Sequence, residues 1–341
     1  MVLLGARGDT ATQMAECLRM LQLQDDAHVR FSRLLTELSE IKAPCTLSAA
    51  NRLYGEETYG FTPTFLEVTK EMFKADLESV DFIGGSEEAR LNINRWVERQ
   101  THGKIPDLLA QGVVDGASRL VLVNAVYFKG SWSRMFKEAA TCDAPFRVNK
   151  TETKTVKMMY QSSKFPFFCI PEFNCQVLEL PYSQRELSML VFLPDDIMDG
   201  TTGLEQLERS LTYDLFTQWT HPDGMREQEV RVRLPRFKMQ EMYDLKEALV
   251  SMGVVNAFDV ALADFSGMSP AEDLVLSQVL HKSFVEVNEE GTEAAAAAAA
   301  VMMLRCARPA AAFIADHPFL FFIRHNPSMS VLFAGRCCSP E

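Results

Sequence analysis

Apolar residues in the first third of the chain recur at the spacing of helices. One stripe places four apolar side chains at i, i+3, i+4 and i+7, on one helical face: Phe31, Leu34, Leu35 and Leu38. Thr62-Pro63 is typical of a helix start, because the first helical position needs no backbone N–H. A second apolar stripe runs through residues 86–101. This part of the chain is therefore predicted to be helical.

Strand patterns take over from residue 120. Residues 120–128 are almost all apolar or aromatic, which fits a strand that is buried on both faces. Further strands are expected within residues 176–193, 230–237, 319–323 and 331–334. A helix is expected over residues 241–252, ended by Gly253. Helices followed by many strands, with little alternation between the two, indicate an α+β fold with large sheets.

Composition and charge narrow the class of protein. The chain has 341 residues, 47% of them hydrophobic, which is enough for a packed core. Its 34 Lys and Arg stand against 46 Asp and Glu, so the net charge is −12. Binding of nucleic acid needs a positive surface, so we expect no nucleic-acid partner. No run approaches the roughly 18 apolar residues of a membrane span, and we expect no membrane partner.

The cysteines and the start of the chain bear on location. The eight cysteines show no metal-ligand spacing, and we expect reduced thiols because the chain is large and begins without a signal peptide. A cytoplasmic protein is therefore expected. Met1-Val2-Leu3-Leu4 resembles the last turn of a buried helix, whereas chain ends are normally polar, so we expect an upstream segment to be missing.

The segment 284–308, FVEVNEEGTEAAAAAAAVMMLRCAR, carries the functional signal. Its alanines allow a surface helix, because alanine has the highest helix propensity. They equally allow a segment that changes partners, since small side chains fit both a solvated loop and a crowded sheet. Arg305 follows apolar residues and suits a trypsin-like protease, whose specificity pocket holds a buried Asp. An exposed arginine is common, so this signal alone is weak.

Motifs along the whole chain strengthen the functional signal of residues 284–308. They are, from the N-terminal side, NAVYFKGSW (124–132), LPRF (234–237), DFSGMS (264–269), VNEEGTEA (287–294), HPFLFFI (317–323) and LFAGR (332–336). In type and order they resemble the signature stretches of the serpin family, and most closely its ovalbumin-related intracellular clade. The resemblance implies an α+β serpin fold, with helices packed around three β-sheets and an exposed reactive-centre loop at about residues 289–310. It also implies one serpin domain over residues 1–341, without the first helix, one strand and most of the second helix.

The resemblance further implies how the loop acts. In this family a protease cleaves the loop and forms its acyl-enzyme, and the loop then inserts into the main sheet as a new strand. The scissile residue lies thirteen positions after the hinge residue Thr292, which gives Arg305, with Cys306 after the bond. Arg308 is a competing site that the family spacing disfavours. The implied hinge consists of Glu290, Gly291, Thr292, Glu293, Ala294, Ala295, Ala296 and Ala297.

Three other residues match the region where the sheet opens in the family. Asn124 and His281 match a polar pair under the centre of the main sheet, and each could satisfy the other's hydrogen bonds. Trp132 matches an aromatic residue at the top of that sheet. Ordinary core packing explains Trp132 equally well, and a satisfied core histidine explains His281. Neither is given a metal-binding or catalytic role.

Two functions remain open from the sequence. The first is a suicide-substrate inhibitor that traps trypsin-like serine proteases covalently. The second is a truncated, non-inhibitory serpin that is cleaved as a substrate or folds poorly. An enzyme is disfavoured, because G-x-S-x-G, H-E-x-x-H and a phosphate-binding glycine loop are all missing. We expect a monomer without a cofactor. The resemblance implies no heparin partner, because heparin-responsive serpins use a basic helix and the corresponding residues 65–82 hold more acidic than basic residues.

Overall fold

The computed structural model describes residues 1–21, 26–41, 45–290 and 310–340. The chain forms two compact units, each assembled from separate stretches of sequence. The first contains Met1–Ile41, Leu47–Phe128 and Met239–Val285, and the second contains Lys42–Thr46, Lys129–Lys238 and Glu286–Glu341. The expected mixture of helices and large sheets is present, so the α+β class is confirmed.

Helices are concentrated in the first unit. They are α1 (Val2–Gly5), α2 (Gly8–Cys17), α3 (Asp26–Ser39), α4 (Pro63–Phe73), α5 (Phe82–Gln100) and α8 (Lys246–Ser251). Helix α4 begins as expected, with Thr62 in the N-cap position and Pro63 as its first residue. Helix α5 begins at Asp81, whose carboxylate accepts a hydrogen bond from the Gly84 N–H.

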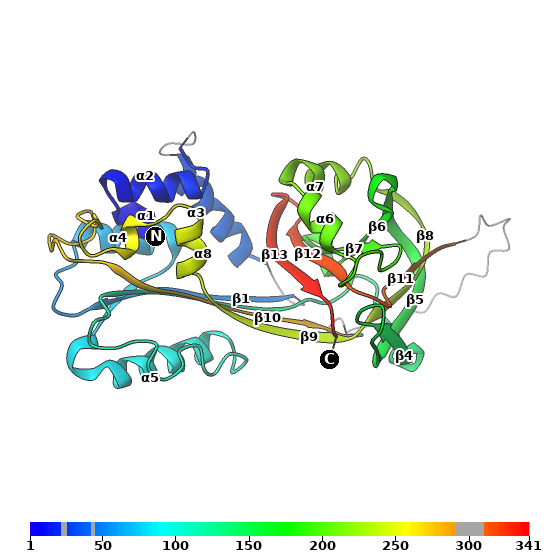
Figure 1. The fold of residues 1–341 in the computed structure, drawn as a ribbon, viewed down its shortest axis with the longest axis horizontal. Coiled ribbons are helices and arrows are strands. Elements are labelled where there is room, and N and C mark those ends of the chain that lie inside the picture. Colours follow the sequence, from blue (N-terminus) through cyan, green and yellow to red (C-terminus); the bar gives the residue numbers. More distant parts are fainter. Residues whose placement is uncertain (22–25, 42–44, 291–309, 341) are drawn as a thin grey trace. The chain divides into compact units, whose positions relative to one another are not determined.

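A five-stranded sheet forms the centre of the first unit, in the order β2-β1-β3-β10-β9. Its strands are β1 (Thr46–Glu56), β2 (Leu77–Val80), β3 (Leu120–Lys129), β9 (Phe237–Asp244) and β10 (Leu276–Val287). Helix α5 covers one face, and α1, α2 and α4 cover the other (Figure 1). Alternate residues of β3 therefore enter two different cores, which explains why residues 120–128 are almost uniformly apolar.

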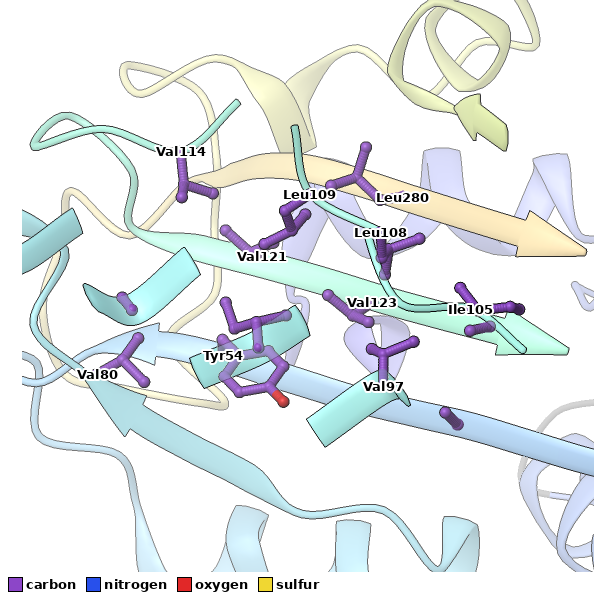
Figure 2. Packing of buried hydrophobic residues seen from close by; sticks show 14 of the residues in the cluster. Tyr54, Val80, Val97, Ile105, Leu108, Leu109, Val114, Val121, Val123 and Leu280 are labelled. Atoms are coloured by element: carbon purple, nitrogen blue, oxygen red, sulfur yellow. The ribbon is translucent and has the colours of Figure 1, made fainter. Parts of the chain in front are cut away.

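The core on the α5 side is drawn in Figure 2. Val121 and Val123 of β3 and Leu280 of β10 pack with Val97 of α5 and with the loop that follows that helix. That loop contributes Ile105, Leu108, Leu109 and Val114. Its side chains lie over β3 and β10, so the loop covers the place where these two strands meet (Figure 2). The opposite core contains Leu120, Leu276 and Val279, from the other faces of the same strands.

The second unit contains an eight-stranded sheet in the order β11-β8-β5-β6-β7-β12-β13, with β4 paired to β5. Its strands are β4 (Cys142–Arg147), β5 (Thr153–Ile170), β6 (Cys175–Pro181), β7 (Leu187–Pro194), β8 (Arg226–Pro235), β11 (Ala311–Ile314), β12 (Phe319–His325) and β13 (Ser330–Cys337). Helices α6 (Glu205–Ser210) and α7 (Tyr213–Trp219) pack on it. The short helical turn η1 (Glu138–Ala140) lies just before β4, while η2 (Pro171–Phe173) connects β5 to β6 and η3 (Ser183–Arg185) connects β6 to β7. The turn η4 (Asn256–Phe258) lies in the first unit.

Two details differ from the expectations. The second and third sheets form one hydrogen-bonded sheet in the described part of the chain, because the long strand β5 pairs with β4, β8 and β6 in turn.

The helix expected over residues 241–252 is wrong in its first part. Strand β9 continues to Asp244, since pairing with β10 satisfies its backbone, and only Lys246–Ser251 is helical. Gly253 adopts φ +100°, in keeping with its expected role as a helix stop.

Candidate functional site

The expected hinge is reached at the end of strand β10. The strand ends at Val287, and Asn288, Glu289 and Glu290 follow it. Of the implied hinge, Glu290 is described by the structure. Seven hinge residues lie outside the described residues: Gly291, Thr292, Glu293, Ala294, Ala295, Ala296 and Ala297. The reactive bond, Arg305 and Cys306, also lies outside the described residues, and so do the alanines with their two interpretations.

Trp132 holds the backbone at the base of this hinge. Its indole Nε1–H donates a hydrogen bond to the carbonyl oxygen of Asn288, at 2.8 Å. The buried indole also stacks on Tyr182, with ring centroids 4.5 Å apart and planes 10° apart. The side chain is therefore fixed by stacking on one side and by the hinge backbone on the other. Plain core packing is an incomplete description of Trp132, because its polar atom contacts the segment that leads into the loop.

Glu289 is a buried carboxylate in the same place. Thr141 donates its hydroxyl to Glu289 Oε1 at 2.7 Å, and a guanidinium nitrogen of Arg236 lies 3.6 Å from Oε2. A buried charge without partners is strongly destabilising, so these two contacts fix Glu289. The more exposed carboxylates beside it also face cations: Glu290 Oε2 lies 3.7 Å from Lys129 Nζ, and Glu286 Oε1 lies 3.9 Å from Lys238 Nζ.

These charged groups line a pocket of about 730 Å³ within the second unit. Met135, Phe136 and Val287 supply its apolar wall. The hinge base thus lines a pocket in which Lys129, Arg236 and Lys238 are paired with the carboxylates of Glu290, Glu289 and Glu286. Sequence reasoning did not single out Glu289, Arg236 or Lys238 as a charged group, although Glu289 lies in the hinge motif and Arg236 in LPRF.

Strands β3 and β10 are direct neighbours in the five-stranded sheet, and their arrows point the same way in Figure 2. A segment that turned back after β10 and entered between β3 and β10 would therefore run antiparallel to both strands. Antiparallel pairing is slightly more stable per residue than parallel pairing. The sheet thus has a place where one added strand would improve its pairing on both sides.

Asn124 of β3 and His281 of β10 meet directly under this junction. His281 Nδ1 and Asn124 Oδ1 are hydrogen-bonded, so the imidazole donates from Nδ1, as the carbonyl oxygen requires. The Asn124 amide in turn donates to Asn51 Oδ1 on β1. Burial lowers the pKa of His281, which favours the neutral ring. The mutual hydrogen bond expected from the sequence is present, while Asn51 was missed because no local pattern marks it.

The loop after α5 is tied to β10 as well. Lys282 Nζ donates to the carbonyl oxygen of Asp107 at 2.8 Å, and Gln278 Nε2 donates to that of Val113 at 3.3 Å. On its other side, the loop is held to α5, because Asn94 both donates to and accepts from the backbone of Leu109. Burial lowers the pKa of Lys282, a residue that is 8% exposed. The loop thus bridges α5 and β10.

Neither a cluster of metal-ligating side chains nor a membrane-spanning helix is found among the described residues. Within the described ranges, no three His, Cys, Asp or Glu side chains gather as a metal site would require. Among the same residues, no helix is both long enough and apolar enough to span a membrane. The seven cysteines that the structure describes are all free thiols.

The chain was then compared with known proteins. The family model of serpins, which are serine protease inhibitors, matches residues 1–340. The chain belongs to the serpin family. Solved serpins share its fold: uncleaved ovalbumin superposes with a TM-score of 0.90 at 39% identity, covering 99% of this chain and 89% of ovalbumin. Maspin superposes with a TM-score of 0.92 at 34% identity, covering 99% and 88%.

Curated relatives are similar over their shared length. The leukocyte elastase inhibitor of Bos taurus is 54% identical over 340 residues, covering all of this chain and 89% of the relative. The inhibitor of that name from Homo sapiens is 52% identical with the same coverage. The serpin fold expected from the motifs is thereby confirmed. Serpins of this type are protease inhibitors, so the expectation that the chain is not an enzyme is confirmed as well.

Proposed function

We propose that this serpin inhibits trypsin-like serine proteases as a suicide substrate, with Arg305–Cys306 as the bond that is cleaved. The observation that carries the proposal is the position of β10. It leads directly into the hinge, and its neighbour β3 runs in the same direction, so a returning segment gains two antiparallel partners. Glu290 and residues 291–297, which are small except for Glu293, are the proposed hinge that turns back.

The chemistry begins as ordinary proteolysis. The protease serine attacks the carbonyl carbon of Arg305, the bond to the Cys306 nitrogen breaks, and the Cys306 amine leaves with a proton. Arg305 is then an ester on the protease. The freed segment from Thr292 to Arg305 enters between β3 and β10, which moves the attached protease by about 43 Å, the length of thirteen extended residues. Distortion of the protease then prevents hydrolysis of the ester by water.

The specificity rests on Arg305. A trypsin-like pocket pairs a guanidinium with a buried Asp, whereas the pocket of elastases is small. The relatives are named elastase inhibitors, which supports a second candidate: cleavage on the N-terminal side of Arg305, at Met303 or Leu304, by a protease that prefers apolar residues. Both candidates use the same strand insertion. They differ in the residue that ends as the ester.

A denaturing gel with trypsin and, separately, with leukocyte elastase tests the proposal. We expect a band at the summed mass with trypsin, which disappears in Arg305→Ala. A band with elastase in the native protein, where position 305 is arginine, would favour the second candidate. Cleaved protein alone, with neither protease retained, would contradict inhibition and support the non-inhibitory alternative.

Melting of the cleaved protein provides an independent check. Cleavage at Arg305 by a catalytic amount of trypsin should raise the melting temperature markedly, because the loop then pairs on both sides in the sheet. An unchanged melting temperature would contradict strand insertion.

We further propose a monomer in the cytoplasm, supported by the free thiols and the acidic composition.

A further inference from the structure

A solvent-exposed face of the second unit lies directly after the reactive-centre loop. Strand β11 begins at Ala311, six residues after Arg305, and it pairs with β8, which pairs with β5 (Figure 1). Two rows of outward side chains cross these three strands. The first row is Ile314, Arg233 and Tyr160, and the second is Ala312, Arg231 and Ser162. We call these six residues the β11–β8–β5 face.

The charge of this face differs from that of the whole protein. The chain has a net charge of −12, yet Arg231 and Arg233 both point to solvent here. Within the described part of the chain, neither guanidinium has an ion-pair partner. The next row contains Lys164 opposite Glu229, whose charges balance each other. Two positive charges of the face therefore remain uncompensated.

The chemistry of the face is that of a contact surface. Tyr160 is 36% exposed and Ile314 is 41% exposed, and the guanidinium of Arg233 lies 6.0 Å from the Tyr160 ring centroid. Exposed aromatic and arginine side chains are the types that dominate binding energies at protein interfaces. The small Ala312 and Ser162 leave space on both sides of Arg231. Beneath the face, Val230, Val232 and Phe313 are fully buried, so the strands provide a rigid base.

The position of the face identifies its partner. Six extended residues from Arg305 span at most about 22 Å. A trypsin-like protease is a domain of roughly 230 residues, with a radius of gyration of about 17 Å and hence a diameter near 45 Å. A protease that holds Arg305 in its active site is therefore too large to avoid the start of β11. Its surface must approach Ile314, Arg231 and Arg233.

We infer that the β11–β8–β5 face is a second contact site for the target protease, and that it selects proteases with an acidic surface beside the active site. This inference rests on the proposed function, because it requires a protease seated at Arg305. Opposite charges accelerate association more than they alter the final contacts. The face thus acts on the rate of encounter, before the ester forms. It has no part in strand insertion.

Anionic and cationic trypsin provide the probe, since they share the preference for arginine but differ in surface charge. The rate constant of covalent complex formation is measured for the native protein and for Arg231→Glu/Arg233→Glu. We expect about a tenfold loss with anionic trypsin, and no loss or a gain with cationic trypsin. The difference should shrink in 1 M salt, where the Debye length is about 3 Å. The stoichiometry of inhibition should not change.

Arg33→Glu/Lys70→Glu is the matched control, because it makes the same change of net charge at two well-exposed side chains of the first unit. The milder Arg231→Gln/Arg233→Gln pair guards against misfolding and should show a smaller loss in the same direction. Equal effects on both trypsins, or an equal loss in the control, would overturn the contact site while leaving the inhibitor intact. Absence of a covalent complex with either trypsin would overturn the proposed function, and the contact site with it.

Discussion

At the scale of single residues, the hinge base is set by the contrast between two consecutive glutamates. Glu289 is buried and has two partners, whereas Glu290 is 72% exposed and has one cation 3.7 Å away. Buried ion pairs lose much when one partner is removed, but exposed pairs contribute little. The two positions therefore form a natural comparison on the same stretch of backbone.

We predict that Glu289→Ala lowers the free energy of unfolding of the uncut protein by about 1–3 kcal/mol, because Thr141 and Arg236 lose their partner. Glu290→Ala is the control and should change it by less than about 0.5 kcal/mol. Urea unfolding followed by tryptophan fluorescence measures both. Equal effects of the two substitutions would show that the burial of Glu289 does not matter for stability.

His281 gives a prediction for pH. Burial lowers the pKa of His281 below its ordinary 6.5, so the folded protein binds the proton less readily than the unfolded chain does. Stability from this group is fully present above pH 6.5 and is lost as the pH falls through the lowered value. The urea midpoint should drop between pH 7.5 and 5.5 more in the native protein than in His281→Gln. An identical drop in both proteins would show that His281 does not cause the loss of stability at low pH.

At the scale of elements, the sequence was most informative where a pattern had one structural solution. The apolar run at 120–128 fitted a strand covered on both faces and is one, and Thr62-Pro63 marked the start of α4 correctly. Residues 241–244 were misread because their strand depends on β10 as a partner, which local periodicity does not reveal. The pairing of Glu289 with Arg236 was not predicted either, because it joins distant segments and local periodicity does not reveal it. Asn124 and His281 were paired from the resemblance to the serpin family, and the need of polar residues in apolar strands for partners agreed with that pairing.

Two hydrogen bonds hold the loop after α5 to β10, one from Lys282 and one from Gln278. Removing them is predicted to change the stability of the uncut protein in opposite directions. Burial lowers the pKa of Lys282, which means that the fold disfavours its charge despite the bond to Asp107. Lys282→Met should therefore stabilise the uncut protein, by about 1–3 kcal/mol. Gln278→Met removes a neutral donor to the same loop and should destabilise it by about 1 kcal/mol.

Melting of the uncut protein measures both substitutions. A stabilised uncut state also has less to gain from strand insertion, so Lys282→Met should raise the number of inhibitor molecules consumed for each protease trapped. Destabilisation by Lys282→Met, equal to that of Gln278→Met, would show that the ammonium is a net support of the fold.

At the scale of the whole molecule, four thiols report on the integrity of the second unit, which contains Cys45, Cys142, Cys175 and Cys337. Cys142 is exposed, whereas Cys45, Cys175 and Cys337 are buried. Burial raises the pKa of Cys45 and Cys337, and it raises the pKa of Cys175 to about 12, so these thiols are protonated at neutral pH. The thiolate is the reactive form. Alkylation therefore separates surface from interior.

Iodoacetamide at pH 7.5 should modify Cys142 within minutes and leave Cys45, Cys175 and Cys337 unmodified until urea is added. Peptide mass spectrometry identifies the sites. Alkylation of the three buried thiols at the rate of Cys142 would contradict the packing of the second unit, where Cys175 and Cys337 lie in strands β6 and β13.

The junction of β3 and β10 also limits how much protease a given number of serpin molecules can inhibit. One junction accepts one segment, and a sheet that has gained two antiparallel neighbours has no reason to release it. Under the proposed mechanism each molecule acts once, and the protein behaves as a titrant. Free protease activity would stay near zero while uncut molecules remain and would rise abruptly when the last is spent. A cell that makes this serpin sets a threshold by copy number, whatever the affinity of the first encounter.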